Sequence, residues 1–107
     1  MTQPTHDTML KVILHAPTPA ALERARNNAV NLRHADPGAD LRIIANAGAV
    51  AVALDTPHTE ADASTWLCPN TLARIERENR HPLQLLDQSA VLAIARLQRE
   101  GWAYIRS

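Results

Sequence analysis

The only cysteine of the chain, Cys68, stands at a predicted junction between a strand and a helix. The Thr-Trp-Leu run at 65–67 favours a short buried strand, and Asn70 is a residue type that caps helices, so a helix is expected over 71–79. A thiol at a helix N-terminus has a lowered pKa, because unpaired amides and the helix dipole favour the thiolate. Residue type and position therefore predict a nucleophilic cysteine.

The alternative for Cys68 is an inert thiol. Free cysteine is among the most buried residue types in proteins and behaves there as a small hydrophobic side chain. On residue type alone the inert interpretation is the commoner one. Reactivity needs an exposed thiol or a lowered pKa, so both interpretations stay open here.

Further polar residues follow the predicted strands, where ligands bind in open parallel sheets. They are His15, Asn46, Asn70, Gln88 and Ser89. We expect His15 and Asn46 to line the approach to Cys68, and a histidine within hydrogen-bond reach of the thiol could activate it as a nucleophile. The alternatives are a histidine whose hydrogen bonds are satisfied within a loop and an asparagine that supplies a turn conformation.

Other common chemistries find no support in the sequence. No metal site is expected, because the remaining histidines are scattered and none stands at metal-ligand spacing: His6, His34, His58 and His81. The chain has only three glycines and neither common phosphate-binding loop, so no nucleotide cofactor is expected. Acid/base hydrolysis is not expected either, because the acids show no pairing beyond that of a solvated surface: Glu60, Asp62, Asp87 and Glu100.

Composition limits the class of protein. With 107 residues, 46% of them hydrophobic, the chain fits one globular domain. The formal net charge is +0, so the composition lacks the excess of positive charge that is typical of proteins that bind nucleic acid or an anionic membrane. One cysteine allows no internal disulfide, and the apolar runs at 9–14 and 47–54 are far shorter than the roughly 20 residues that span a bilayer. We expect a cytoplasmic protein.

Strand and helix signals alternate along the chain after a flexible arm at 1–8. Strands are expected at 9–15, 41–45, 65–67, 83–86 and 102–105. Helices are expected after Thr18, at 47–54, at 71–79 and after Ser89, with a surface turn at 55–64. Short buried strands joined by helices imply a single three-layer α/β/α domain over 9–107, with a mostly parallel five-stranded sheet. The wholly apolar helix at 47–54 fits an oligomer contact or burial within the monomer equally well.

Three stretches carry a resemblance to the DsrE/DsrF-like family (YchN-like fold). Residues 68–72 (Cys-Pro-Asn-Thr-Leu) resemble its Cys-x-Asn-Ser/Thr-Leu stretch, and residues 97–105 are similar to its closing Leu-Gln-x-Glu-Gly-Tyr/Trp-Ala-Tyr-Ile pattern. Asn46, Gly48 and Val50 are similar to the Asn-Gly-x-x-Val stretch after the second strand, with Ala47 in place of the first glycine. The resemblance covers nearly all of 9–105, and it is closest to the small stand-alone members.

The resemblance implies the same α/β/α fold, assembled as a homotrimer or homohexamer. It also implies two functions, since some members carry a persulfide on the cysteine that matches Cys68 and others have no assigned role. The first expectation is therefore a sulfur-relay protein, a sulfurtransferase-like carrier with a sulfur donor or acceptor protein as partner and no cofactor. The second is a non-catalytic homo-oligomeric binding or assembly protein, in which Cys68 is incidental.

Overall fold

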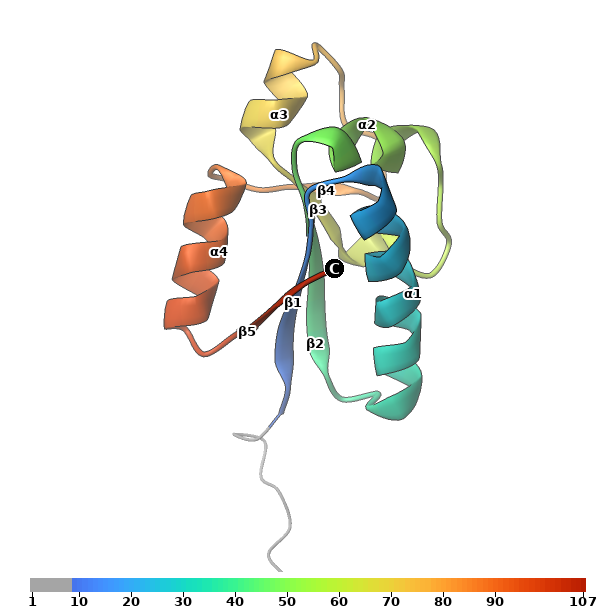
Figure 1. Ribbon diagram of the computed structural model, residues 1–107, viewed down its shortest axis with the longest axis vertical. Helices are drawn as coiled ribbons and strands as arrows, with labels where there is room; N and C mark the ends of the chain where they lie inside the picture. Colours follow the sequence, from blue (N-terminus) through green and yellow to red (C-terminus); the bar gives the residue numbers. More distant parts are fainter. Residues whose placement is uncertain (1–8) are drawn as a thin grey trace, which may run out of the picture.

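The computed structural model describes residues 9–107, which form a five-stranded parallel sheet with helices on both faces (Figure 1). The strands, in the spatial order β4-β3-β2-β1-β5, are β1 (Lys11–Ala16), β2 (Asp40–Ala45), β3 (Thr65–Leu67), β4 (Gln84–Leu85) and β5 (Ala103–Arg106). The helices are α1 (Pro19–Ala35), α2 (Gly48–Asp55), the short 3₁₀ turn η2 (Asp62–Ser64), α3 (Pro69–Arg74) and α4 (Ala90–Arg99). The predicted three-layer α/β/α domain is confirmed. The arm predicted at 1–8 lies outside the described residues.

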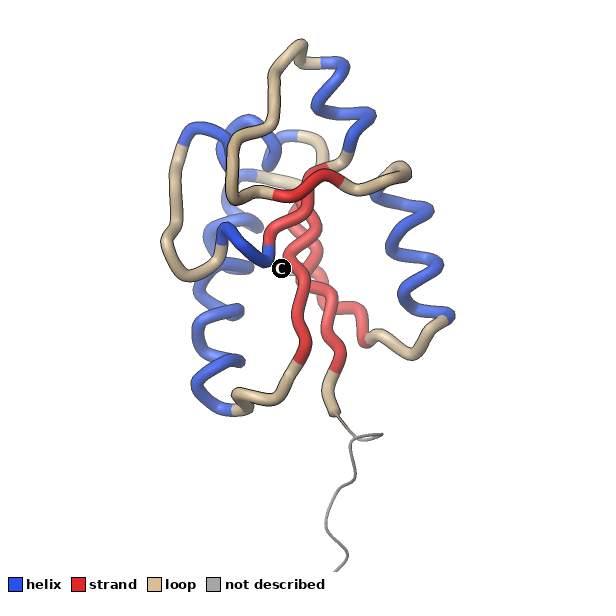
Figure 2. The backbone as a smooth tube through the Cα atoms, turned by 180° about the vertical axis from the view of Figure 1, so that it is seen from behind, coloured by secondary structure: helices blue, strands red, loops and turns tan. Residues whose placement is uncertain are grey.

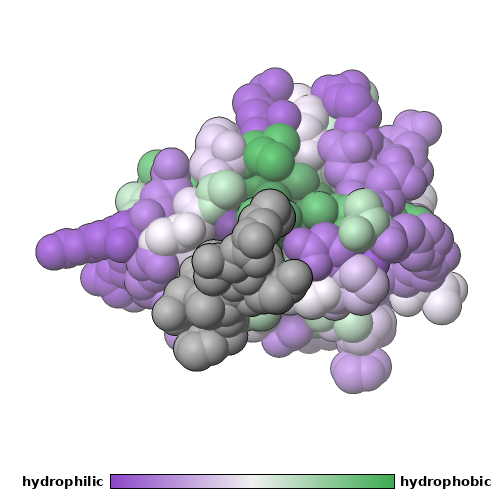
Figure 3. All heavy atoms as spheres, turned by 90° about the horizontal axis from the view of Figure 1, so that it is seen from below, coloured by the Kyte–Doolittle hydropathy of each residue, from purple (hydrophilic) through white to green (hydrophobic). Residues whose placement is uncertain are grey.

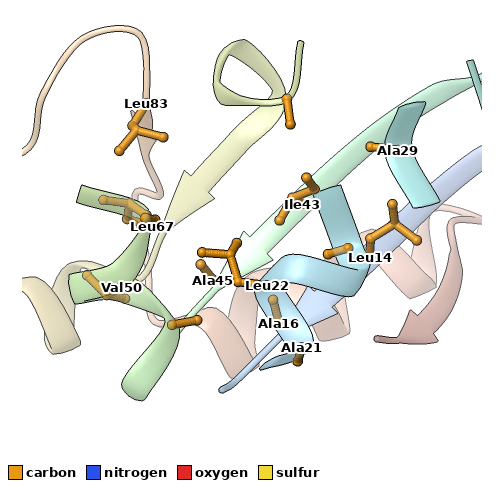
Figure 4. Close-up of a cluster of buried hydrophobic side chains, with 14 of the residues drawn as sticks. Leu14, Ala16, Ala21, Leu22, Ala29, Ile43, Ala45, Val50, Leu67 and Leu83 are labelled. Atoms are coloured by element: carbon orange, nitrogen blue, oxygen red, sulfur yellow. The ribbon is translucent and has the colours of Figure 1, made fainter. Parts of the chain in front are cut away.

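One face of the sheet is covered by α1 and α2. Leu14 and Ile43 of the central strands pack there against Leu22 of α1 and Val50 of α2 (Figure 4). Thr18 caps α1 by accepting a hydrogen bond from the Ala21 amide at 3.1 Å, as the Thr-Pro signal predicts.

Helix α2, the wholly apolar helix of the sequence, packs within the monomer. Its residues Ala49, Val50, Ala53 and Leu54 are buried against this cluster. An apolar helix buried on this face needs no partner chain to cover it. Burial within the monomer is therefore the alternative that the structure supports for 47–54.

The opposite face is covered by α4 (Figure 2). Ile94 and Leu97 of this helix pack on Ile13 of β1 and Ile44 of β2. Five strands about 4.8 Å apart span about 19 Å, whereas a helix with its side chains is only about 10 Å wide. Helix α4 therefore leaves part of the sheet uncovered on each of its flanks.

The other strands and helices differ from the predicted ranges by at most two residues at their ends, whereas the third helix differs at both of its ends. Helix α3 begins at Pro69 with Cys68 as its N-cap, because proline lacks an amide hydrogen and its fixed φ suits the first helical position. Asn70 is therefore not the cap. The helix ends at Arg74 rather than 79, because Glu76 adopts a left-handed φ of 55° and the Arg77 amide bonds back to the Leu72 carbonyl at 3.3 Å.

The segment predicted as a surface turn at 55–64 contains a buried carboxylate. Asp62 is only 3% exposed, and its Oδ2 accepts a hydrogen bond from the His58 amide at 2.9 Å and forms an ion pair with Arg80 Nη2 at 2.9 Å. Arg26 Nη2 lies 3.5 Å from Oδ1. The expectation that Asp62 is a solvated surface acid is wrong, since two cations distant in sequence compensate its burial.

The loop from β2 to α2 holds a strained alanine. Ala47 has φ 48° and ψ −132°, a backbone conformation that glycine adopts readily and alanine does not. Its amide donates a hydrogen bond to the hydroxyl of the buried Thr71 at 3.2 Å. This bond ties the end of β2 to α3.

Replacing Ala47 with glycine is expected to raise the free energy of unfolding by about 1 kcal/mol. Relief of about 1–3 kcal/mol of backbone strain exceeds the roughly 0.5–1 kcal/mol of added chain entropy. Urea denaturation measures the change. As a control, Ala51→Gly inside α2 should lower the same free energy by about 1 kcal/mol, because position 51 is helical. Equal destabilisation by both variants would contradict the strain at position 47.

Candidate functional site

Cys68 follows β3 and lies on the face of the sheet that α4 covers. Its amide donates to the Ala45 carbonyl at 3.0 Å, which extends the pairing of β2 and β3 by one residue. Its side chain is 5% exposed. The Sγ atom accepts a hydrogen bond from the amide of Ala90, the first residue of α4, at 3.4 Å. The sulfur therefore lies at the start of two helices, α3 and α4.

Burial is the largest single influence on the Cys68 thiol and raises its pKa. Hydrogen bonds from the Thr71 and Ala90 amides, the Thr71 hydroxyl and the Asn70 amide act in the opposite direction. Together they outweigh burial, and the pKa of Cys68 lies below its ordinary value. Cys68 is therefore buried, as the inert interpretation expects, and has a lowered pKa, as the reactive interpretation expects.

His15 and Asn46, at the ends of β1 and β2, contact each other directly. His15 Nε2 lies 2.9 Å from Asn46 Oδ1, and His15 Nδ1 lies 2.6 Å from the hydroxyl of Tyr104. Asn46 Oδ1 can only accept, so Nε2 is the donor of that bond, whereas the Tyr104 hydroxyl can both donate and accept and suits either state of Nδ1. The three side chains form one hydrogen-bonded chain from β2 through β1 to β5.

Tyr104 was not identified from the sequence as a site residue. Strand β5 pairs with β1 in parallel, which brings residue 104 beside a histidine 89 positions earlier in the chain. The sequence feature that could have identified it is a tyrosine in a short C-terminal strand. The hydroxyl of such a tyrosine can form a hydrogen bond with a side chain of the neighbouring strand.

A cavity of about 320 Å³ lies beside this hydrogen-bonded chain, on the β1/β5 flank of α4. Its lining is His15, Asn46, Tyr104, Ala90, Val91, Ile94 and Gln98. Cys68 does not line it. Ala90 does, and its amide bonds the Cys68 sulfur, so the first turn of α4 separates the thiol from the cavity.

The structure does not form the Cys–His pair that the sequence allowed. Both ring nitrogens of His15 are engaged by Asn46 and Tyr104, and no hydrogen bond joins His15 to Cys68 within residues 9–107. Activation of the thiol therefore comes from amide dipoles and not from a general base. The Asn70 side chain is exposed on α3, so only its backbone amide acts on the sulfur.

Gln88 and Ser89, the two polar residues predicted after the fourth strand, have different contacts. Ser89 caps α4 by accepting from the Leu92 amide at 3.4 Å. Gln88 lines a second cavity on the other flank of α4. Neither residue lines the cavity beside His15.

Among residues 9–107, the His, Cys, Asp and Glu side chains form no group of three that could hold a metal ion. No helix in this part of the chain is both long and apolar enough to cross a bilayer. In comparisons with known proteins, no family model and no curated protein matched the chain. The likeness to DsrE/DsrF-like proteins stays a prediction.

The alkylation rate of Cys68 is expected to rise with pH around a midpoint below the value of about 8.5 for a free thiol. The amides that bond the sulfur cause the shift. Iodoacetamide labelling followed by mass spectrometry gives the profile. The same chain unfolded in guanidinium is the control, and its midpoint should return to about 8.5. Coincident profiles for folded and unfolded chain would contradict the amide effect.

The lowered pKa also predicts a pH dependence of stability. Between the folded pKa and the unfolded value of about 8.5, the unfolded chain holds a proton that the folded chain has lost. The free energy of unfolding should therefore increase as pH rises through this interval, and the contribution is lost as pH falls through the folded pKa. Cys68→Ser should abolish this part of the pH dependence.

Proposed function

We propose that this protein is a cytoplasmic carrier of sulfane sulfur, with Cys68 as the residue that holds the persulfide. The observation that carries the proposal is the convergence of amides on one buried thiol, which lowers its pKa although burial alone raises it. Thiolate is the form of cysteine that attacks sulfur. The resemblance of residues 68–72 to the cysteine stretch of DsrE/DsrF-like proteins supports the same function.

The transfer needs no oxidant, metal or cofactor. The Cys68 thiolate attacks the terminal sulfur of a donor persulfide, and a new S–S bond forms at Cys68. The S–S bond of the donor breaks, its electron pair stays with the donor sulfur, and the donor leaves as a thiolate. Attack by an acceptor thiolate on the terminal sulfur of the Cys68 persulfide completes the relay and returns the Cys68 thiolate. The partners in this proposal are a sulfur donor and a sulfur acceptor protein.

Access to Cys68 requires movement of the first turn of α4. The thiol is 5% exposed, and Ala90 lies between it and the cavity lined by His15 and Asn46. Displacement of this turn would join the sulfur to a cavity of about 320 Å³. In the carrier, this cavity is the space where the outer sulfur atom meets the donor or the acceptor.

Incubation of the purified protein with a small-molecule persulfide donor is expected to add the mass of one sulfur atom. Intact-mass spectrometry measures the gain, and a reducing agent should reverse it because a persulfide is reducible. Cys68→Ser, which keeps the size of the side chain, is the control and should gain nothing. If the wild-type protein also gains no mass, or if the serine variant gains it equally, Cys68 is not a sulfur carrier.

A second candidate function is a non-catalytic binding or assembly protein that works as a homotrimer or homohexamer. Two observations favour it: the cavity with the polar chain His15–Asn46–Tyr104 lacks Cys68, and strand β5 is exposed along its length. An exposed edge strand offers unpaired backbone groups to another chain. Apolar side chains are also exposed, with Ile105 at 47% and Met9 and Leu10 at 46% each. Figure 3, which shows the molecule from below, has hydrophobic atoms exposed between hydrophilic ones.

If assembly uses the β5 edge, Ile105→Glu should reduce the mass in solution to that of one chain, 11.7 kDa. A charge at an apolar subunit contact is desolvated without a partner, which destabilises the assembly. Sedimentation velocity measures the mass. Ala95→Glu, which places the same charge on exposed α4, is the control and should leave the mass unchanged. A wild-type protein that sediments as a single chain would contradict assembly.

A further inference from the structure

A positively charged residue occupies an inward-facing position of the central sheet. Arg42 lies in the middle of β2 and pairs with Ile13, whose side chain belongs to the core cluster under α4. Buried parallel strands are normally continuous runs of apolar residues. Ile44, two positions further along the same face of β2, is fully buried and follows that rule. Arg42 breaks it.

Two indole rings lie beside the guanidinium of Arg42. The guanidinium carbon lies 4.9 Å from the ring centroid of Trp66 and 4.9 Å from that of Trp102. Trp66 belongs to β3, and Trp102 immediately precedes β5, so the two rings come from opposite sides of β2. Two cation–π contacts within about 6 Å of the ring centroids are favourable and hold the guanidinium near both rings.

The two cation–π contacts leave the N–H donors of Arg42 without an acceptor among the described residues. A guanidinium carries five N–H donors, and attraction of its charge to a ring does not satisfy them. Within residues 9–107, the structure forms no hydrogen bond or ion pair from Arg42 to another side chain or to the backbone. The N–H donors of Arg42 have no acceptor in the described part of the protein and are therefore available to an external acceptor.

Arg42 lines a cavity of about 310 Å³ on the β3/β4 flank of α4. A second cation, Arg96 of α4, and the amide of Gln88 also line it. The carboxylates of Asp87 and Glu100 belong to the lining too, but both residues are exposed and neither pairs with Arg42. Exposed charges are screened by water and salt, whereas the half-buried Arg42 interacts in a lower dielectric.

We propose that this cavity, here called the Arg42 cavity, binds a small organic oxyanion whose carboxylate or phosphate group is held by the in-plane donors of Arg42. Carboxylate and phosphate oxygens match the spacing of the guanidinium fork and accept two parallel hydrogen bonds from it. Leu86, Ala93 and Leu97 supply an apolar wall for the organic part of the ligand. The site shares no lining residue with the cavity beside His15, so the proposal does not depend on sulfur transfer at Cys68.

The chain provides its own reporter for this site, because Trp66 and Trp102 are its only two tryptophans. Intrinsic fluorescence is to be measured on the full-length protein while inorganic phosphate or sodium butyrate is added at constant ionic strength. Saturable change of the indole emission with at least one of the two anions is expected. The anion that binds identifies the oxyanion as a phosphate or a carboxylate.

Arg42→Lys is expected to weaken binding about tenfold or more, because lysine keeps the charge between the rings but cannot make the bidentate contact. Arg96→Gln should weaken it less, and Arg99→Gln, a matched loss of charge on the exposed surface outside the lining, should leave it unchanged. Equilibrium dialysis with labelled phosphate or butyrate checks affinities independently of the indoles, and circular dichroism checks that each variant folds.

Three outcomes would overturn the proposal. They are the absence of a saturable response to both anions up to about 50 mM, equal binding by the wild type and Arg42→Lys when both are folded, and loss of binding by Arg99→Gln as large as that of Arg42→Lys. The last result would mean that only the net charge of the protein attracts the anion. Sulfur loading of Cys68 is measured separately, so failure of one proposal is distinguishable from failure of the other.

Discussion

The packing of α4 on the sheet is the contact on which the candidate sites depend. Its first residue, Ala90, gives its amide to the Cys68 sulfur, while Ile94 and Leu97 fix the helix over Ile13. A helix is narrower than five strands, so one helix on this face leaves a cavity on each flank. The same geometry therefore produces a covered thiol in the middle, a polar cavity beside His15 on the β1/β5 side and a cavity lined by Arg42 on the β3/β4 side.

Most of the fold could be predicted because local signals repeat along the chain. Runs of Val, Ile and Leu indicate buried strands, Thr18 with Pro19 indicates the start of α1, and helices between strands require parallel pairing. Parallel strands end at one edge of the sheet, which is why His15 and Asn46, at the ends of two neighbouring strands, meet within 2.9 Å. The start of α3 at Pro69 was a local signal as well, because proline favours the first helical position over a place before an asparagine cap.

Features that depend on long-range contacts could not be predicted. The sequence indicates that Asp62 is a surface acid. Its burial is possible only because Arg26 and Arg80 approach it from other segments. Tyr104 reaches His15 through the pairing of β5 with β1, and the two indoles near Arg42 come from β3 and from the residue before β5, on either side of β2. Sequence spacing contains no information on these contacts. The burial of Cys68 was one of the two alternatives for its residue type, but its cause is long-range, because α4 covers it from 22 positions further along the chain.

Reactivity and accessibility of Cys68 oppose each other in this fold. The Ala90 amide stabilises the thiolate, yet the turn that carries this amide also closes the path from the cavity to the sulfur. Opening that turn exposes the thiolate and removes one of the hydrogen bonds that lower its pKa, while the Thr71 and Asn70 contacts from α3 remain. The proposed sulfur transfer therefore requires that the first turn of α4 move away from Cys68. The exposed face of this turn carries Val91, which is 77% exposed.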